Sequence, residues 1–200
     1  GKAGSYTYSS SGSVSQFKLN SSNTFLVKSL PAGTYTVTEH GKNSDGSIPY
    51  YTRTGGVSKT VTVTAGGIGT VTFTNTRNTG TGEVIKTWID TNGNTISASS
   101  NTERNQQIYF RIKNADNKYI TVSGSRYSGS YTFTGTSTTA TSLYVNPRTG
   151  EFTVSELPTG KYTVYEYGSP EGYSVNKASQ TITISRDKTS SVSFVNSEDS

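Results

Sequence analysis

The sequence has no cysteine and no methionine, and it has a single histidine, His40, and a single tryptophan. Disulfide bonds are therefore excluded, although small secreted domains often depend on them. Without cysteine or a second histidine, neither a zinc site nor a Cys-His pair is available, so we expect no metal site, no cofactor and no enzyme of the conventional kind. A chain with a thin core and no disulfide needs another source of stability, and a different covalent crosslink would restrict the unfolded chain in the same way.

Clusters of like charge and long apolar runs are also missing. The formal net charge is +5, but the lysine and arginine residues are scattered along the chain. Because a nucleic-acid-binding face normally shows clustered basic residues, no nucleic-acid partner is expected. No apolar run approaches the ~20 residues of a membrane span, and no signal peptide is recognisable. The chain begins at Gly1 rather than at methionine, so we expect a fragment of a longer protein.

Residues that favour β-strands are abundant instead. The chain has 14 tyrosines, and valine, threonine, tyrosine and isoleucine alternate with polar residues over many short runs. Such alternation is typical of strands that are buried on one face. Asp45-Gly46 and Asn92-Gly93 predict hairpin turns between such runs. The sequence therefore predicts an all-β protein with a thin core.

An internal repeat determines the domain count. Residues 30–39 match residues 157–166, and residues 59–75 match residues 180–196 without a gap. We therefore predict that two copies of one β-domain follow each other.

The two copies differ in their opening segments. We predict a first domain at residues 1–77, a linker at residues 78–82 and a second domain at residues 83–200. The second domain has a strand around Lys86 and another around residues 109–112 before the repeated region begins. The first domain lacks these opening strands and is N-terminally incomplete.

Three polar residues continue rows of apolar side chains in the predicted strands of the second domain. Because side chains of a strand alternate between its faces, Glu166 shares a face with Tyr162 and Val164. Lys86 and Asn196 each continue an apolar row in their own strands in the same way. An isolated buried carboxylate is costly, so Glu166 should be neutral, paired, or both.

Each of these polar residues could instead be a strand-end group that turns to solvent. Lys86 is the most ambiguous, because Ile85 and Ile89 offer a competing apolar face. Three such placements within one repeat-sized unit favour a shared buried site.

The same segments resemble a known family. Residues 84–90, 162–173 and 193–196 are similar to Cna B-type domains, the immunoglobulin-like modules of Gram-positive surface adhesins and pilins. The resemblance covers residues 82–197 well and residues 4–76 in part. It implies two tandem Ig-like, prealbumin-like β-sandwich domains, of which the first lacks its opening strands.

The resemblance also implies a covalent crosslink. In the family, a lysine of the first strand and an asparagine of the last strand form a spontaneous isopeptide bond, assisted by a glutamate. By motif match these are Lys86, Asn196 and Glu166. Burial would favour a neutral lysine beside a protonated glutamate, which would polarise the asparagine carbonyl and shuttle protons until ammonia leaves. Because the reaction is a single turnover within one molecule, it is self-maturation rather than enzyme catalysis.

The first domain has the glutamate and the asparagine of this set but no obvious lysine. Glu39 and Asn75 lie in phase with apolar neighbours and match the two positions, so Asn75 is a second candidate for a crosslink. Three explanations remain open: the opening strands belong to residues outside the fragment, another chain donates them by β-augmentation, or Lys2 substitutes. We favour the first two, because no apolar strand surrounds Lys2.

The function that the resemblance implies is structural. We expect a stalk segment of an adhesin or pilin-like protein that is extracellular, anchored to the cell wall of a Gram-positive bacterium, and in contact with neighbouring domains of the same protein. The alternative is an adhesive module that binds a host matrix protein or a glycan directly, since the tyrosines could supply a stacking surface.

Overall fold

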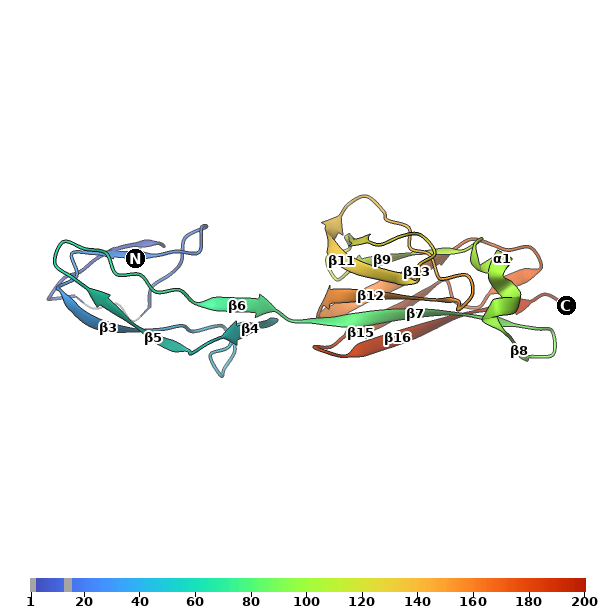
Figure 1. Cartoon of the computed structure of the whole chain (residues 1–200), viewed down its shortest axis with the longest axis horizontal. Coiled ribbons are helices and arrows are strands. Elements are labelled where there is room, and N and C mark those ends of the chain that lie inside the picture. The colour runs from blue at the N-terminus through green and yellow to red at the C-terminus, as the bar shows by residue number, and fades with distance from the viewer. Residues whose placement is uncertain (1–2, 13–15) are drawn as a thin grey trace. The chain divides into compact units, whose positions relative to one another are not determined.

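The structure is a computed structural model that describes residues 3–12 and 16–200. Apart from two short helical turns, its regular elements are β-strands, which confirms the all-β prediction. The chain divides into two compact units, Gly1–Thr76 and Arg77–Ser200 (Figure 1), and each is described by itself. No helix of the described residues is long and apolar enough to cross a membrane.

The strands of the second unit are mostly long, and a 3₁₀ turn and one turn of α-helix lie among them. They are β7 (Thr79–Ile89), β8 (Thr95–Ile96), η1 (Ala98–Asn101), α1 (Thr102–Asn105), β9 (Tyr109–Asn114), β10 (Tyr119–Ser123), β11 (Ser130–Ser137), β12 (Glu151–Pro158), β13 (Gly160–Tyr167), β14 (Tyr173–Val175), β15 (Ser179–Ile184) and β16 (Thr189–Glu198).

These strands form one hydrogen-bonded sheet that folds over on itself (Figure 1). The order is β14-β16-β7-β12-β11-β10-β9-β13-β15, with β8 paired to β7 outside this path. The ring of Phe110 on β9 lies 5.2 Å from that of Phe194 on β16 and 5.6 Å from that of Phe152 on β12. The half of the sheet that holds β16, β7 and β12 therefore packs against the half that holds β9 and β13, as in a β-sandwich.

The space between the two halves is filled by one apolar cluster. Its members are Val84, Trp88, Ile108, Phe110, Ile112, Ile120, Tyr131, Leu143, Val145, Phe152, Val154, Leu157, Tyr162, Val164, Ile182, Ile184 and Phe194.

The strand β7 resolves the uncertainty about the face of Lys86. Alternate residues of β7 from Gly80 to Trp88 are buried, and Lys86 is one of them. Ile85 and Ile89 lie on the other face and are only half-buried. The apolar row that contains Lys86 is therefore the core-facing one.

The same strand corrects the linker boundary. The predicted linker, residues 78–82, lies almost wholly within β7, which begins at Thr79. A Cβ atom on Gly80 would lie 2.2 Å from the carbonyl oxygen of Ser185, and the Thr81 N–H donates to the Lys188 carbonyl at 2.8 Å. The glycine serves close approach of two backbones rather than flexibility, which glycine content alone does not distinguish.

The strands of the first unit are shorter. They are β1 (Ser5–Thr7), β2 (Leu26–Lys28), β3 (Gly33–Thr38), β4 (Tyr51–Thr54), β5 (Ser58–Val63) and β6 (Thr74–Arg77), which ends at the first residue of the second unit.

The strands of the first unit form three separate pairs, β1 with β2, β3 with β5, and β4 with β6. Among its described residues none is fully buried, and residues of β3 and β5 alternate between half-buried and exposed. One face of these strands is therefore covered only in part.

Candidate functional site: a buried lysine, glutamate and asparagine

Two parallel neighbouring strands carry the lysine and the asparagine. In the pairing of β7 with β16, Lys86 lies opposite Phe194, and Asn196 lies opposite Trp88. Positions two residues apart on neighbouring strands share a face and are diagonal neighbours. Lys86 and Asn196 therefore both point into the sandwich from the same layer.

Glu166 reaches the same point from the opposite layer. It lies on β13, whose residues Tyr162 and Val164 are also buried. The Lys86 Nζ atom lies 2.9 Å from Glu166 Oε2, and both side chains are 0% exposed. The structure thus brings together the three residues named from the sequence.

The hydrogen bonding of this site is incomplete. Lys86 Nζ donates to Asn196 Oδ1. The same amine forms an ion pair with Glu166 Oε2, whereas Glu166 Oε1 is buried without a hydrogen-bond partner. Asn196 Nδ2 is also buried without a hydrogen-bond partner. Buried polar groups of folded proteins are nearly always satisfied, so Glu166 Oε1 and Asn196 Nδ2 are exceptions within this core.

Burial shifts both ionisable groups toward their neutral forms. Loss of solvation lowers the pKa of Lys86, and the nearby Glu166 carboxylate opposes that shift only in part. Loss of solvation likewise raises the pKa of Glu166, against the opposing effect of the Lys86 ammonium. A neutral amine is a nucleophile and a protonated carboxyl is an acid, so each group is moved toward its reactive form.

The tryptophan of β7 forms one wall of the site. Lys86 Nζ lies 4.7 Å from the centre of the Trp88 ring. The Trp88 indole N–H donates to Asn105 Oδ1 at 2.8 Å, and Asn105 Nδ2 donates to the Pro147 carbonyl at 2.8 Å. Asn105 was not identified from the sequence, where the only signal is that a buried indole N–H needs an acceptor.

The segment after β13 closes the outer side of that wall. The Tyr173 ring packs edge-on against Trp88 with 5.0 Å between ring centres. The guanidinium of Arg104 lies 4.8 Å from the centre of the Tyr173 ring. Trp88 is therefore held on both sides, and the position of the amine beside it is well defined.

The equivalent residues of the first unit form a different arrangement. Asn75 Nδ2 donates to Glu39 Oε2 at 2.9 Å, and Arg53 Nε donates to Glu39 Oε1 at 2.7 Å. The Arg53 and Glu39 side chains are 17% and 18% exposed. An arginine thus pairs with Glu39, whereas a lysine pairs with Glu166. Sequence reasoning missed Arg53, and Lys2 lies outside the described residues.

Within the described part of the chain, no three histidine, cysteine, aspartate or glutamate side chains gather in a way that could hold a metal ion. The chemistry open to the second-unit site is that of an amine, a carboxyl group and a carboxamide shielded from water. Such a set can form an amide bond between lysine and asparagine with loss of ammonia.

One protein-family model matches each part of the chain. Residues 71–198 match the family model of the SpaA prealbumin-like fold domain. Residues 1–77 match the model of a domain of unknown function, DUF7601. A comparison with curated proteins finds no match.

Several solved pilin structures are similar to the chain at low identity. The minor pilin GBS52 of Streptococcus agalactiae is 17% identical with a TM-score of 0.47, over 86% of this chain and 62% of that one. A streptococcal ancillary pilin is 18% identical with a TM-score of 0.43, over 84% and 46%. The shaft pilin SpaA of Lactobacillus rhamnosus GG is 16% identical with a TM-score of 0.42, over 84% and 65%. The chain spans less than two-thirds of the length of each.

Proposed function

The chain belongs to the family of SpaA prealbumin-like fold domains, and from this premise we propose that it is a structural stalk segment of a Gram-positive adhesin or pilin-like surface protein. The parent protein would be extracellular and anchored to the cell wall. In it, this chain would supply tandem Ig-like domains that contact their neighbours along the same polypeptide. The observation that carries the proposal is the buried set of Lys86, Glu166 and Asn196, which suits a covalent crosslink and no conventional catalysis.

The crosslink would join the strands that carry load. Because β7 and β16 run parallel as neighbours, tension between the start of β7 and the end of β16 shears their hydrogen-bonded ladder. An isopeptide bond between Lys86 and Asn196 would oppose that sliding directly. A stalk that holds a binding tip away from a cell needs this resistance.

The bond would form by attack of neutral Lys86 Nζ on the Asn196 side-chain carbonyl carbon. Protonated Glu166 would polarise the carbonyl and then carry a proton from the attacking nitrogen to the leaving nitrogen. The carbon-nitrogen bond to Nδ2 breaks and ammonia leaves. Each molecule reacts once, so the protein is its own substrate and not an enzyme.

The intact mass of the denatured chain tests this proposal. We expect a deficit of one ammonia in the wild-type chain and none in a Lys86→Arg variant. Lys161→Arg, a change of an exposed lysine on β13, is the matched control and should keep the deficit. A wild-type chain of full mass would overturn the proposal.

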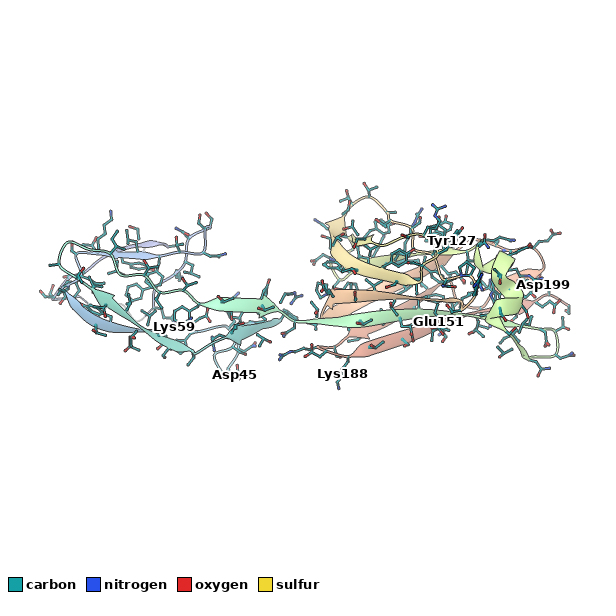
Figure 2. All side chains as sticks on the ribbon, in the orientation of Figure 1. Asp45, Lys59, Tyr127, Glu151, Lys188 and Asp199 are labelled. Carbon is teal, nitrogen blue, oxygen red and sulfur yellow. The ribbon has the colours of Figure 1, made fainter. Side chains whose placement is uncertain are left out.

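A second candidate function is direct adhesion to a glycan, and one surface favours it. On the outer side of the second unit, the Tyr109 and Tyr167 rings stack with 5.3 Å between centres, and the Arg111 guanidinium lies 4.7 Å from the Tyr167 ring. Beside them, Arg126 lies 4.3 Å from the ring of Tyr144. Figure 2 labels Tyr127, whose ring contacts that of Tyr144.

Tyrosine faces pack on sugar rings, and guanidinium groups bind carboxylate or sulfate. The glycan would therefore be acidic. Binding of the chain to acidic but not neutral members of a glycan array, with loss in an Arg126→Glu variant, would support this candidate. Equal binding of the wild-type chain and the Arg126→Glu variant to acidic glycans would rule out this candidate. A lack of binding by the wild-type chain would also rule it out.

A further inference from the structure

The outer side of β9, β10 and β13 combines positive charge with aromatic rings. Phe110, Ile112 and Val164 are buried, so the residues between them point away from the core. The outward residues of these three strands include Arg111 and Lys113 at the centre of β9 and no aspartate or glutamate. We call this surface the tyrosine face, after its outward tyrosines: Tyr109, Tyr119, Tyr165 and Tyr167.

The two central cations of the tyrosine face lie against rings and not against carboxylates. The Arg111 guanidinium lies 4.7 Å from the centre of the Tyr167 ring, and Lys113 Nζ lies 4.8 Å from that of Tyr119. Among the described residues neither cation forms an ion pair, and Arg111 Nε is buried without a hydrogen-bond partner. The rings attract and orient both cations but leave their charges unneutralised.

The outer side of β7, β12 and β16 carries the opposite charge. Glu83 on β7 and Glu151 on β12 (labelled in Figure 2) point away from the core, because the next residues, Val84 and Phe152, are buried. No outward residue of these three strands is a lysine or an arginine. Within the described part of the chain neither glutamate has an ion-pair partner. We call the outward residues of these strands the acidic face.

Apolar side chains accompany the two glutamates. Ile85 lies directly opposite Glu151 in the pairing of β7 with β12, and it is two residues from Glu83 on β7. Ile89 and Val195 share this outer side, and all three apolar residues are half-buried. The acidic face therefore offers carboxylates beside an apolar row, which complements the cations and rings of the tyrosine face.

The charges have a similar spacing on the two faces. Arg111 and Lys113 are two residues apart on one strand, which separates their Cα atoms by ~7 Å. Glu83 lies opposite Thr153 and Glu151 lies opposite Ile85, so the two glutamates are diagonal neighbours, ~7–8 Å apart. Both cations of one face can therefore meet both carboxylates of the other at the same time.

We propose that the tyrosine face docks on the acidic face of a second copy of this chain, with Arg111 and Lys113 against Glu83 and Glu151. An acidic glycan would match the tyrosine face alone, whereas a second copy matches both faces. This contact goes beyond the proposed stalk function, because it joins neighbouring stalks side by side.

The two faces cannot both be satisfied in a closed pair. They are the outer sides of the two halves of one sandwich and point in opposite directions. Each added copy therefore leaves one tyrosine face and one acidic face free, and the association is heterologous and open-ended.

A single contact of this kind is weak. Exposed ion pairs contribute little individually, and salt screens them. Where two stalks stand side by side on one surface, each contact after the first forms within an existing assembly, and the contacts reinforce one another. In solution the association of separate chains should therefore need high concentration and low salt.

Sedimentation equilibrium of the full chain tests the proposal, at concentrations up to about 1 mM, where weak contacts are populated. At low ionic strength we expect an average mass that rises past that of a dimer as concentration increases. In about 1 M salt, where the screening length is about 3 Å, the mass should return to that of the monomer. An Arg111→Glu/Lys113→Glu chain and a Glu83→Lys/Glu151→Lys chain should each stay monomeric.

An equimolar mixture of these two variants separates docking from a general effect of charge. The reversed faces of the two variants complement each other, and so do their unchanged faces, so the mixture should associate again. An Arg186→Glu/Lys188→Glu chain is the matched control (Lys188 is labelled in Figure 2). It has the same net charge as the Arg111→Glu/Lys113→Glu chain, but its changes lie at exposed positions between β15 and β16, so it should associate as the wild-type chain does.

Three results would overturn the proposal: a wild-type chain that is monomeric at low ionic strength, a dimer that does not grow, or a mixture of the variants that stays monomeric. If the monomeric wild-type chain binds acidic glycans and the Arg111→Glu/Lys113→Glu chain does not, the tyrosine face is a glycan site instead. The intact mass of the same samples reports the crosslink of the proposed function separately.

Discussion

The Lys86 side chain is not exposed to solvent, so its amine loses the stabilisation that hydration would give. The neighbours of Lys86 offset different parts of this desolvation cost. The Glu166 carboxylate lies 2.9 Å away, the Asn196 oxygen accepts a hydrogen bond, and the Trp88 ring offers its face at 4.7 Å. A buried charge is tolerated only with such partners. Among these partners, Glu166 is the one that would also supply the proton route in the proposed crosslinking reaction.

Glu166→Gln should therefore leave the second unit folded but without its crosslink. The proposed crosslink would close a loop between residues 110 positions apart. Its absence would lower the free energy of unfolding by about 4–5 kcal/mol through loop entropy alone. Urea denaturation beside intact mass measures both effects. Glu171→Gln, at an exposed position five residues later, should change neither. A Glu166→Gln chain that still lost ammonia would refute the role of Glu166.

The rate of crosslinking should have a bell-shaped dependence on pH. Burial lowers the pKa of Lys86 from its ordinary value of 10.5 and raises the pKa of Glu166 from its ordinary value of 4.5. The reactive state has a neutral amine and a protonated carboxyl, so the rate rises as the amine loses its proton and falls as the carboxyl does. Both limbs should lie between the ordinary values.

The measurement starts from chain recovered unfolded and free of the bond. It is refolded by dilution over a range of pH, and the loss of ammonia is followed by mass. A rate that keeps rising up to about pH 10, as expected for a solvated lysine, would contradict the participation of a buried acid in the reaction.

At the scale of elements, β7 depends on glycines for its fit. Gly80→Ala should destabilise the second unit by about 1–3 kcal/mol, because the new Cβ would meet the Ser185 carbonyl oxygen at 2.2 Å. Gly82→Ala is the matched control in the same strand, since its Cβ would meet only side-chain ends of Ile184 and Leu157 at 3.3 and 3.4 Å. Urea denaturation should show the larger loss for Gly80→Ala, and equal losses would be evidence against the close backbone approach.

The site was more predictable than the boundaries of the elements. Lys86, Glu166 and Asn196 stood out because strand periodicity assigns a face to each residue, and a polar residue on an apolar face is an anomaly. The start of β7 was missed, because Gly80 and Gly82 have the composition of a linker. Arg53 and Asn105 were missed for another reason: their roles come from contacts between distant segments, which local periodicity does not encode.

At the scale of the molecule, the two units differ in how completely they are covered. The resemblance to Cna B-type domains is confirmed by the family match over residues 71–198, and the second unit has the buried core that such a sandwich requires. The first unit has no fully buried residue among those described. Stability should therefore be distributed unequally along the chain.

Amide hydrogen exchange of the chain alone should show this difference. Residues 189–194 of β16 pair with β7, whereas the matching residues 68–73 form no strand. We expect exchange from residues 68–73 to be faster by several orders of magnitude, because exchange from β16 requires opening of the sandwich. Because residues 68–73 match residues 189–194 without a gap, each amide of one segment can be compared with its counterpart in the other. Comparable protection of the two segments would argue against an unequal distribution of stability between the two units.

The parallel pairing of β7 with β16 also bears on how such a domain can vary. If Lys86 and Asn196 are joined as proposed, a pulling force would pass from the beginning of β7 through one amide to the end of β16. The intervening polypeptide, with α1, the tyrosine-rich outer side and every loop between, would be a closed ring under no tension. Selection for mechanical strength would then act on few positions, and the ring would be free to vary its exposed surface.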